Sequence, residues 1–126
     1  MTGKPELTLE IDVNLLTLNE YIDVERSNRY KAASLKKSLT TKVKLQTMSQ
    51  TRTQLKGQYD LVLDWYRINK RHDPDNVFFG IKFILDGIAA AKVIPNDDRN
   101  NIRNIHHNIH QGNKNAVIIN FYSTKK

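Results

Sequence analysis

The run YDLVLDWY at residues 59–66 decides the fold. Most of its residues are branched or aromatic, and Leu61, Leu63 and Trp65 alternate with more polar neighbours. This pattern is typical of a strand with one buried face. A strand that leads into a helix and then into further strands predicts a layered domain of helices and sheet.

The segment that follows this strand predicts a helix from Pro74 to about Lys92. Asp73 can accept a hydrogen bond from a free N–H of the first turn, and proline fits the first helical position without losing a needed donor. Val93-Ile94-Pro95 ends the helix. The apolar residues recur at helical spacing and form its expected core stripe: Val77, Ile81, Ile84, Leu85 and Ile88.

The rest of the chain supplies the remaining elements. Residues 7–13 alternate as a strand, 18–22 read as a connection, and 28–48 form a basic amphipathic helix. The runs 102–109 and 116–122 are expected to form a hairpin, because a Gly-Asn turn separates them. The order β-α-β-α-β-β predicts an α/β (or α+β) fold with one mixed sheet and two helices on one face.

Composition narrows the class of protein. The 126 residues suit a single domain over 1–126, and the net charge of +7 favours polyanionic partners such as nucleic acid. The absence of cysteine excludes disulfides and thiolate metal sites. No run approaches the ~18 apolar residues that a membrane span needs, and the first residues do not resemble a secretory signal. We therefore expect a cytoplasmic protein without membrane contact.

Two pairs of carboxylates bracket the predicted 74–92 helix. Asp73 and Asp75 precede it, and Asp97 and Asp98 follow it. Each pair alone has a structural explanation, the first as a helix cap and the second as a turn. Their combination favours a site, provided that the strand after Asp98 brings this turn back beside the end of the 59–66 strand.

The helix between the pairs adds a lysine and a further carboxylate. Lys82 follows Asp75 by seven residues and precedes Asp86 by four, so the three side chains project from one side of a helix. Oxygen ligands of this kind suit Mg²⁺, with Mn²⁺ as a substitute. Such an ion activates water and neutralises a phosphodiester during hydrolysis. Three basic residues flank the acids and could hold phosphates: Lys70, Arg71 and Arg99.

Four pieces in order resemble the RusA family of Holliday junction resolvases, which occur in phages and prophages. They are Asp73-Pro74-Asp75-Asn76, Lys82, Ile84-Leu85-Asp86-Gly87 and Asn96-Asp97-Asp98. The motifs cover residues 67–101, and the length and element order of the whole chain are also similar. Lys82 lies nearly one helical turn further from the second aspartate than in the family pattern, but it keeps the four-residue spacing to Asp86.

The resemblance implies roles for individual residues. Asp73, Asp75 and Asp98 would hold Mg²⁺, Lys82 would be the catalytic helix lysine, and Asn19 and Asn76 would contact DNA. It also implies a homodimer that places two active sites on a four-way DNA junction. A two-fold junction needs two symmetric cuts, which gives a physical reason for the dimer.

The sequence therefore predicts a Mg²⁺-dependent endodeoxyribonuclease that resolves Holliday junctions by paired symmetric cleavage, in DNA recombination and repair. Two alternatives stay open. One is a non-catalytic DNA-binding protein of the same fold, in which the carboxylates are only helix caps and turn residues. The other is a metal-dependent RNA nuclease.

Overall fold

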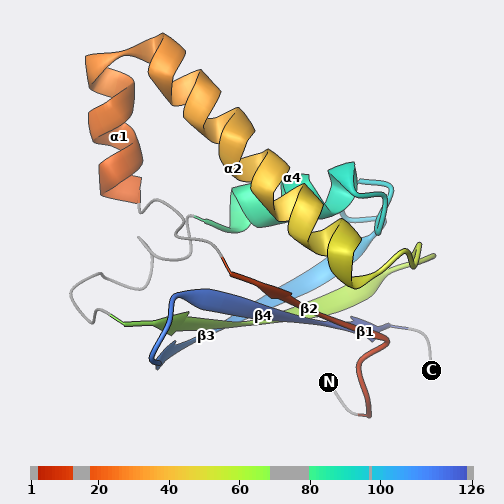
Figure 1. Ribbon diagram of the computed structural model, residues 1–126. Coiled ribbons are helices and arrows are strands. Elements are labelled where there is room, and N and C mark those ends of the chain that lie inside the picture. The colour runs from red at the N-terminus through yellow and green to blue at the C-terminus, as the bar shows by residue number, and fades with distance from the viewer. Residues whose placement is uncertain (1–2, 13–17, 69–79, 97, 125–126) are drawn as a thin grey trace.

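The computed structural model describes residues 3–12, 18–68, 80–96 and 98–124, with only the backbone at 18–21 (Figure 1). The strands form one sheet in the order β1-β4-β2-β3, in which β2 and β3 are parallel and the other two pairs are antiparallel. The predicted mixed sheet in a mixed α/β fold is therefore confirmed. The elements in chain order are β1 (Leu7–Ile11), α1 (Leu18–Ser27), α2 (Arg29–Gln50), β2 (Tyr59–Arg67), α4 (Ile81–Ala90), β3 (Ile102–Gln111) and β4 (Ala116–Ser123).

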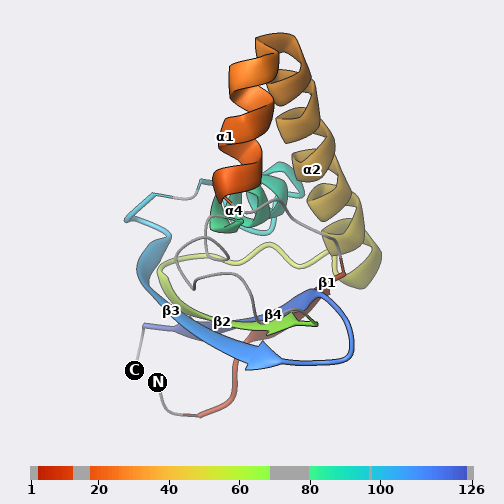
Figure 2. The same ribbon diagram turned by 90° about the vertical axis from the view of Figure 1, so that its left-hand side faces the viewer.

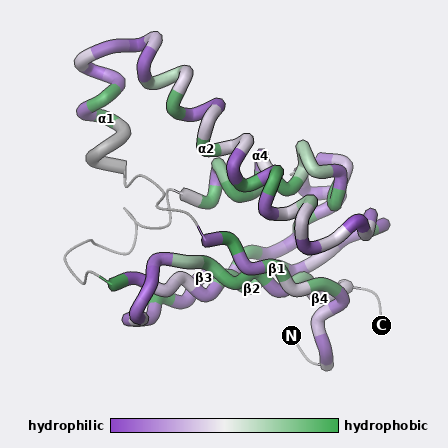
Figure 3. The backbone as a smooth tube through the Cα atoms, viewed as in Figure 1, coloured by the Kyte–Doolittle hydropathy of each residue, from purple (hydrophilic) through white to green (hydrophobic). Residues whose placement is uncertain are grey.

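Strand β2 lies inside the sheet and carries the centre of the core. Leu61 and Leu63 are completely buried, and Trp65 is nearly so. They lie on the sheet face that the helices cover, together with Ile119 and Phe121 of β4. Figure 3 shows hydrophobic residues along the strands and along α4, the elements that supply most of the buried core. The alternation in residues 59–66 thus predicted this strand and its buried face correctly.

The helices lie on one face of the sheet (Figures 1 and 2). Helix α2 begins after Asn28, whose side-chain oxygen accepts hydrogen bonds from the N–H groups of Tyr30 and Lys31 at 2.9 and 3.1 Å. Helix α1 was not predicted, because residues 18–22 show little periodicity. In the described part of the chain, no helix is both long enough and apolar enough to span a bilayer.

Helices α2 and α4 approach each other very closely at Gly87. A Cβ atom added to Gly87 would lie 2.5 Å from both Cβ and Cγ1 of Val43. Ile84 and Ile88 of α4 are fully buried on either side of this contact, as the apolar stripe predicted. The predicted start of this helix at Pro74 lies outside the described residues. In α2, Thr47 is buried, whereas Met48 is half exposed and lies outside the core.

The predicted hairpin between residues 102–109 and 116–122 is wrong. Both strands exist, but β2 lies between them and pairs with each. The connection between them crosses the end of β2, where the N–H of Gly112 donates to the carbonyl of Arg67 at 3.0 Å and the N–H of Ile68 donates to Asn115 Oδ1 at 3.0 Å. The more apolar β2 takes the inner position, and the polar β3 is left at the edge.

The two edges of the sheet differ. Along β1, the side chains of Gln46 and Gln50 of α2 bond to the backbone of Asp12 and Glu10 and so occupy its outer polar groups. No described strand pairs with the outer side of β3. Exposed edges of this length are sites at which another chain can add a strand.

An ion pair between a nearly buried aspartate and an exposed arginine joins β2 to β3. Asp60 is 5% exposed, and Arg103 donates to both of its carboxylate oxygens, at 3.0 and 2.6 Å. Arg103 reaches Asp60 because the register shifts between Tyr59 and Asp60. The hydrogen bonds from Arg103 are the main reason why the pKa of Asp60 lies below its usual range.

This pair predicts a defined pH dependence of stability. Because folding lowers the pKa of Asp60, its contribution is present above the unfolded-state pKa of about 3.9 and is lost as the pH falls through the lower folded-state value. Arg103→Gln should lower the urea midpoint at pH 7, and the gap to the parent protein should narrow at pH 3. A gap of equal size at both pH values would show that the charge of Asp60 is not involved.

Candidate metal and nucleic-acid site

The structure describes three of the predicted site residues with their side chains. Asp98 and Arg99 lie in the turn before β3, and Lys82 lies in the first turn of α4. Asn19 falls within α1, where only the backbone is described. The other predicted residues lie outside the described part of the chain: Lys70, Arg71, Asp73, Asp75 and Asn76, together with Asp97, which was the alternative to Asp98.

Asp98 organises the turn in which it stands. Its Oδ1 accepts hydrogen bonds from the N–H of Asn100 at 3.1 Å and from the side-chain amide of Asn101 at 3.0 Å. Its backbone carbonyl accepts from the N–H groups of Asn101 and Ile102, at 3.1 and 2.9 Å. The described turn runs from Asp98 onward, whereas the turn predicted at 96–98 includes Asp97, which lies outside the described residues; Asp98 is exposed, and the loop holds its carboxylate in position.

Lys82 and Asp86 lie on the same side of α4, as their spacing predicts. Lys82 Nζ lies 3.2 Å from Asp86 Oδ1, and the lysine side chain is 54% exposed. An exposed i,i+4 pair of this kind adds little stability. It does fix a cation at the start of α4, which is where the chain arrives from the segment that contains Asp73 and Asp75.

Asp98 lies beside the start of β2. Tyr59 pairs with Ile102, and the N–H of Tyr59 donates to the carbonyl of Asn101 at 2.9 Å. The expectation that the following strand returns Asp98 to the end of β2 was therefore wrong. The two strands are parallel, so β3 runs from Asp98 toward that end and does not bring Asp98 there.

Any meeting of the three aspartates depends on residues 69–79. These residues lie outside the described part of the chain, so the convergence of Asp73, Asp75 and Asp98 stays a prediction. Within the described ranges themselves, no three histidine or carboxylate side chains form a metal site.

Helix α2 supplies a concentration of positive charge outside the predicted site. Its 22 residues contain no acidic side chain and six basic ones, and none of these pairs with a carboxylate of a described residue. From the sequence, this segment was predicted to be a basic amphipathic helix with its lysines in solvent. The basic residues are Arg29, Lys31, Lys36, Lys37, Lys42 and Lys44.

Comparison with known proteins gives no further assignment: no protein-family model matches the chain, and no curated protein matches it.

Proposed function

We propose that this protein is a Mg²⁺-dependent endodeoxyribonuclease that cuts branched DNA, in the manner of the RusA-type Holliday junction resolvases that its motifs resemble. Asp73, Asp75 and Asp98 would hold the metal ion. The ion would activate water and stabilise the leaving oxygen, and Lys82 would stabilise negative charge in the transition state. Lys70, Arg71 and Arg99 would hold the flanking phosphates, with DNA contacts from Asn19 and Asn76.

One observation carries the proposal. In the sequence, acidic motifs precede and follow a helix, and the exposed side of that helix carries the ion pair between Lys82 and Asp86. The four-residue spacing between Lys82 and Asp86, and the ion pair between them, support the resemblance. They do so at Lys82, the residue whose distance from the second aspartate departs from the family pattern. The fixed, exposed carboxylate of Asp98 supports it as well, because metal ligands are held by a second set of hydrogen bonds.

The same hydrogen bonds favour one alternative. A carboxylate that orders its own turn needs no metal to explain it, so a DNA-binding protein without catalysis would keep Asp98 for structure alone. Incubation of the protein with a synthetic four-way junction separates the two functions. The nuclease cuts the junction only when Mg²⁺ or Mn²⁺ is present, whereas the binding protein retards it in a gel without cutting it.

A homodimer belongs to this proposal, and the outer edge of β3, with which no described strand pairs, is the surface that supports it. Pairing of two β3 strands about a two-fold axis through His107 would place Ile105 of one protomer opposite Ile109 of the other. These isoleucines are 37% and 40% exposed in the single chain. Arg103 would then face Gln111, so no like charges meet.

Ile109→Lys is therefore expected to convert a dimer into a monomer. Each protomer would bring one lysine into the β3–β3 interface, so two lysines would lie in it. Sedimentation equilibrium reads the mass directly. Leu45→Lys is the matched control, because Leu45 is also exposed but stands on α2. A dimer that survives Ile109→Lys, or dissociates equally in both variants, would place the interface elsewhere.

A further inference from the structure

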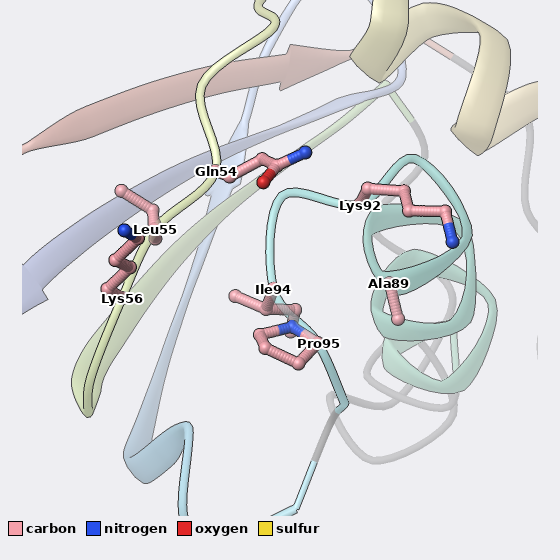
Figure 4. Close-up of a pocket in the computed structure, with 7 residues that line it drawn as sticks. All are labelled: Gln54, Leu55, Lys56, Ala89, Lys92, Ile94 and Pro95. Atoms are coloured by element: carbon pink, nitrogen blue, oxygen red, sulfur yellow. The ribbon is translucent and has the colours of Figure 1, made fainter.

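A pocket of about 440 Å³ opens between the segment before β2 and the end of α4. Figure 4 shows Gln54, Leu55 and Lys56 on one side, Lys92 at the end of the helix, and Ile94 and Pro95 between them. The volume falls in the range of pockets that bind small organic groups. No residue of the proposed metal site lines it.

The wall of the pocket is apolar and fixed by the core. Leu55 and Ile94 are 6% and 1% exposed, so both side chains are anchored in the interior. The N–H of Leu55 donates to the carbonyl of Val93 at 2.7 Å and ties the two sides together. The side chains of Leu55 and Ile94 form the buried floor of the pocket, and the apolar surface that a ligand can contact is that of the exposed Pro95 and the partly exposed Ala89.

The rim is basic. Lys56 and Lys92 are both exposed, and neither pairs with a carboxylate of a described residue. The exposed amide of Gln54 adds a donor and an acceptor at the same opening. Cations beside an apolar surface match a nucleotide, whose aromatic base is joined through its sugar to the flanking phosphates.

Lys92 stands where the backbone favours glycine. Its φ of 69° is in the left-handed region. The N–H groups of Lys92 and Val93 donate to the carbonyls of Ala89 and Ile88 at 3.0 and 3.3 Å, which is the hydrogen-bond pattern of a glycine-terminated helix. A cation is favourable anywhere in the last turn, so the helix dipole alone does not explain a lysine at the strained position. Lysine at this position places a cation at the rim of the pocket where glycine would be less strained.

The pocket belongs to the same group of loops as Asp98. The side-chain amide of Gln58 donates to the carbonyl of Arg99 at 2.8 Å, and the N–H of Tyr59 bonds to Asn101. These bonds join the segment of Lys56 to the turn of Asp98.

We infer that this pocket binds one nucleotide of an unpaired DNA strand. The base packs against Pro95 and Ala89, above the buried side chains of Leu55 and Ile94, and Lys56 and Lys92 contact the adjacent phosphates. The choice of DNA as the ligand rests on the proposed function. The binding itself needs neither the metal ion nor cleavage, so it can be tested separately.

The test is the affinity for a fluorescent single-stranded thymidine octamer, measured by anisotropy in EDTA. The double variant Lys56→Gln/Lys92→Gln should bind on the order of tenfold more weakly and have a shallower salt dependence, because two phosphate contacts are lost. Lys37→Gln/Lys44→Gln removes the same charge from α2 and should bind within about twofold of the parent protein. Equal losses in the two variants would overturn the inference in favour of non-specific attraction, and no loss in the first would overturn it outright.

Lys92→Gly separates binding from folding. Glycine relieves the left-handed strain, so this variant should melt at a higher temperature and yet bind the octamer more weakly. Lower stability together with weaker binding would contradict the assignment. Octamer binding is measured in EDTA and junction cleavage in Mg²⁺, so failure of the pocket and failure of the nuclease proposal give different results.

Discussion

Asp98→Asn is expected to abolish cleavage of a four-way junction, with a loss of at least about 100-fold, because a metal ligand loses its charge. The fold should remain intact. An asparagine side-chain oxygen can accept the hydrogen bonds that Oδ1 now accepts from Asn100 and Asn101. The rate of nicking is measured on a labelled junction, and circular dichroism verifies the fold.

Two further variants make this result specific. Asp64→Asn removes the same charge from β2 and should cut at the parent rate. Asp97→Asn tests the neighbouring carboxylate, which the sequence left as the alternative ligand. Parent-like cleavage by Asp98→Asn together with loss in Asp97→Asn would move the ligand by one residue. Parent-like cleavage by both variants would remove this turn from the metal site.

Gly87→Ala should destabilise the fold by about 3 kcal/mol, at the upper end of the usual cost of overpacking. The added methyl would lie 2.5 Å from two atoms of Val43 and 3.0 Å from the backbone nitrogen of Lys44, so the two helices must move apart. Both helices cover the same sheet face, and their separation would open the core. Urea unfolding of the parent and variant proteins measures the difference.

A second substitution tests the cause. Val43→Gly removes the atoms that the new methyl would meet, so the double variant should lose less stability than the two single effects sum to. Gly112→Ala is the control, because a Cβ atom there would lie 3.3 Å from Tyr66 Cβ and needs only a small adjustment. Additive effects of Gly87→Ala and Val43→Gly would show that the close approach does not determine the cost.

The sequence predicted the strands better than their arrangement. Alternation identified β2 and its buried face, because that pattern depends on local geometry alone. Partner choice depends on which strand buries most apolar surface, and this is a property of the whole sheet. The polar composition of β3 was visible in the sequence, but the adjacent turn favoured a hairpin with β4. Helix α1 was missed because its residues show little apolar periodicity.

The candidate site was predictable where it is local. Spacing alone placed Lys82 and Asp86 on one side of α4, and the Asn-Asp-Asp run predicted the turn at Asp98. The end of the sheet at which Asp98 lies depends on the parallel pairing of β2 and β3, which no local pattern encodes. The pocket at Lys92 was missed for a similar reason, since two segments distant in sequence form it. A lysine at a helix end that favours glycine was the one local signal.

The most direct test of the proposed function is cleavage of a synthetic four-way DNA junction by the parent protein, with Mg²⁺ and with EDTA. We predict paired nicks at symmetric positions in the presence of Mg²⁺ and an intact, bound junction in EDTA. Binding without nicks under both conditions would contradict the proposal and favour a non-catalytic DNA-binding protein. Faster cleavage of an RNA substrate than of the junction would contradict it in favour of an RNA nuclease.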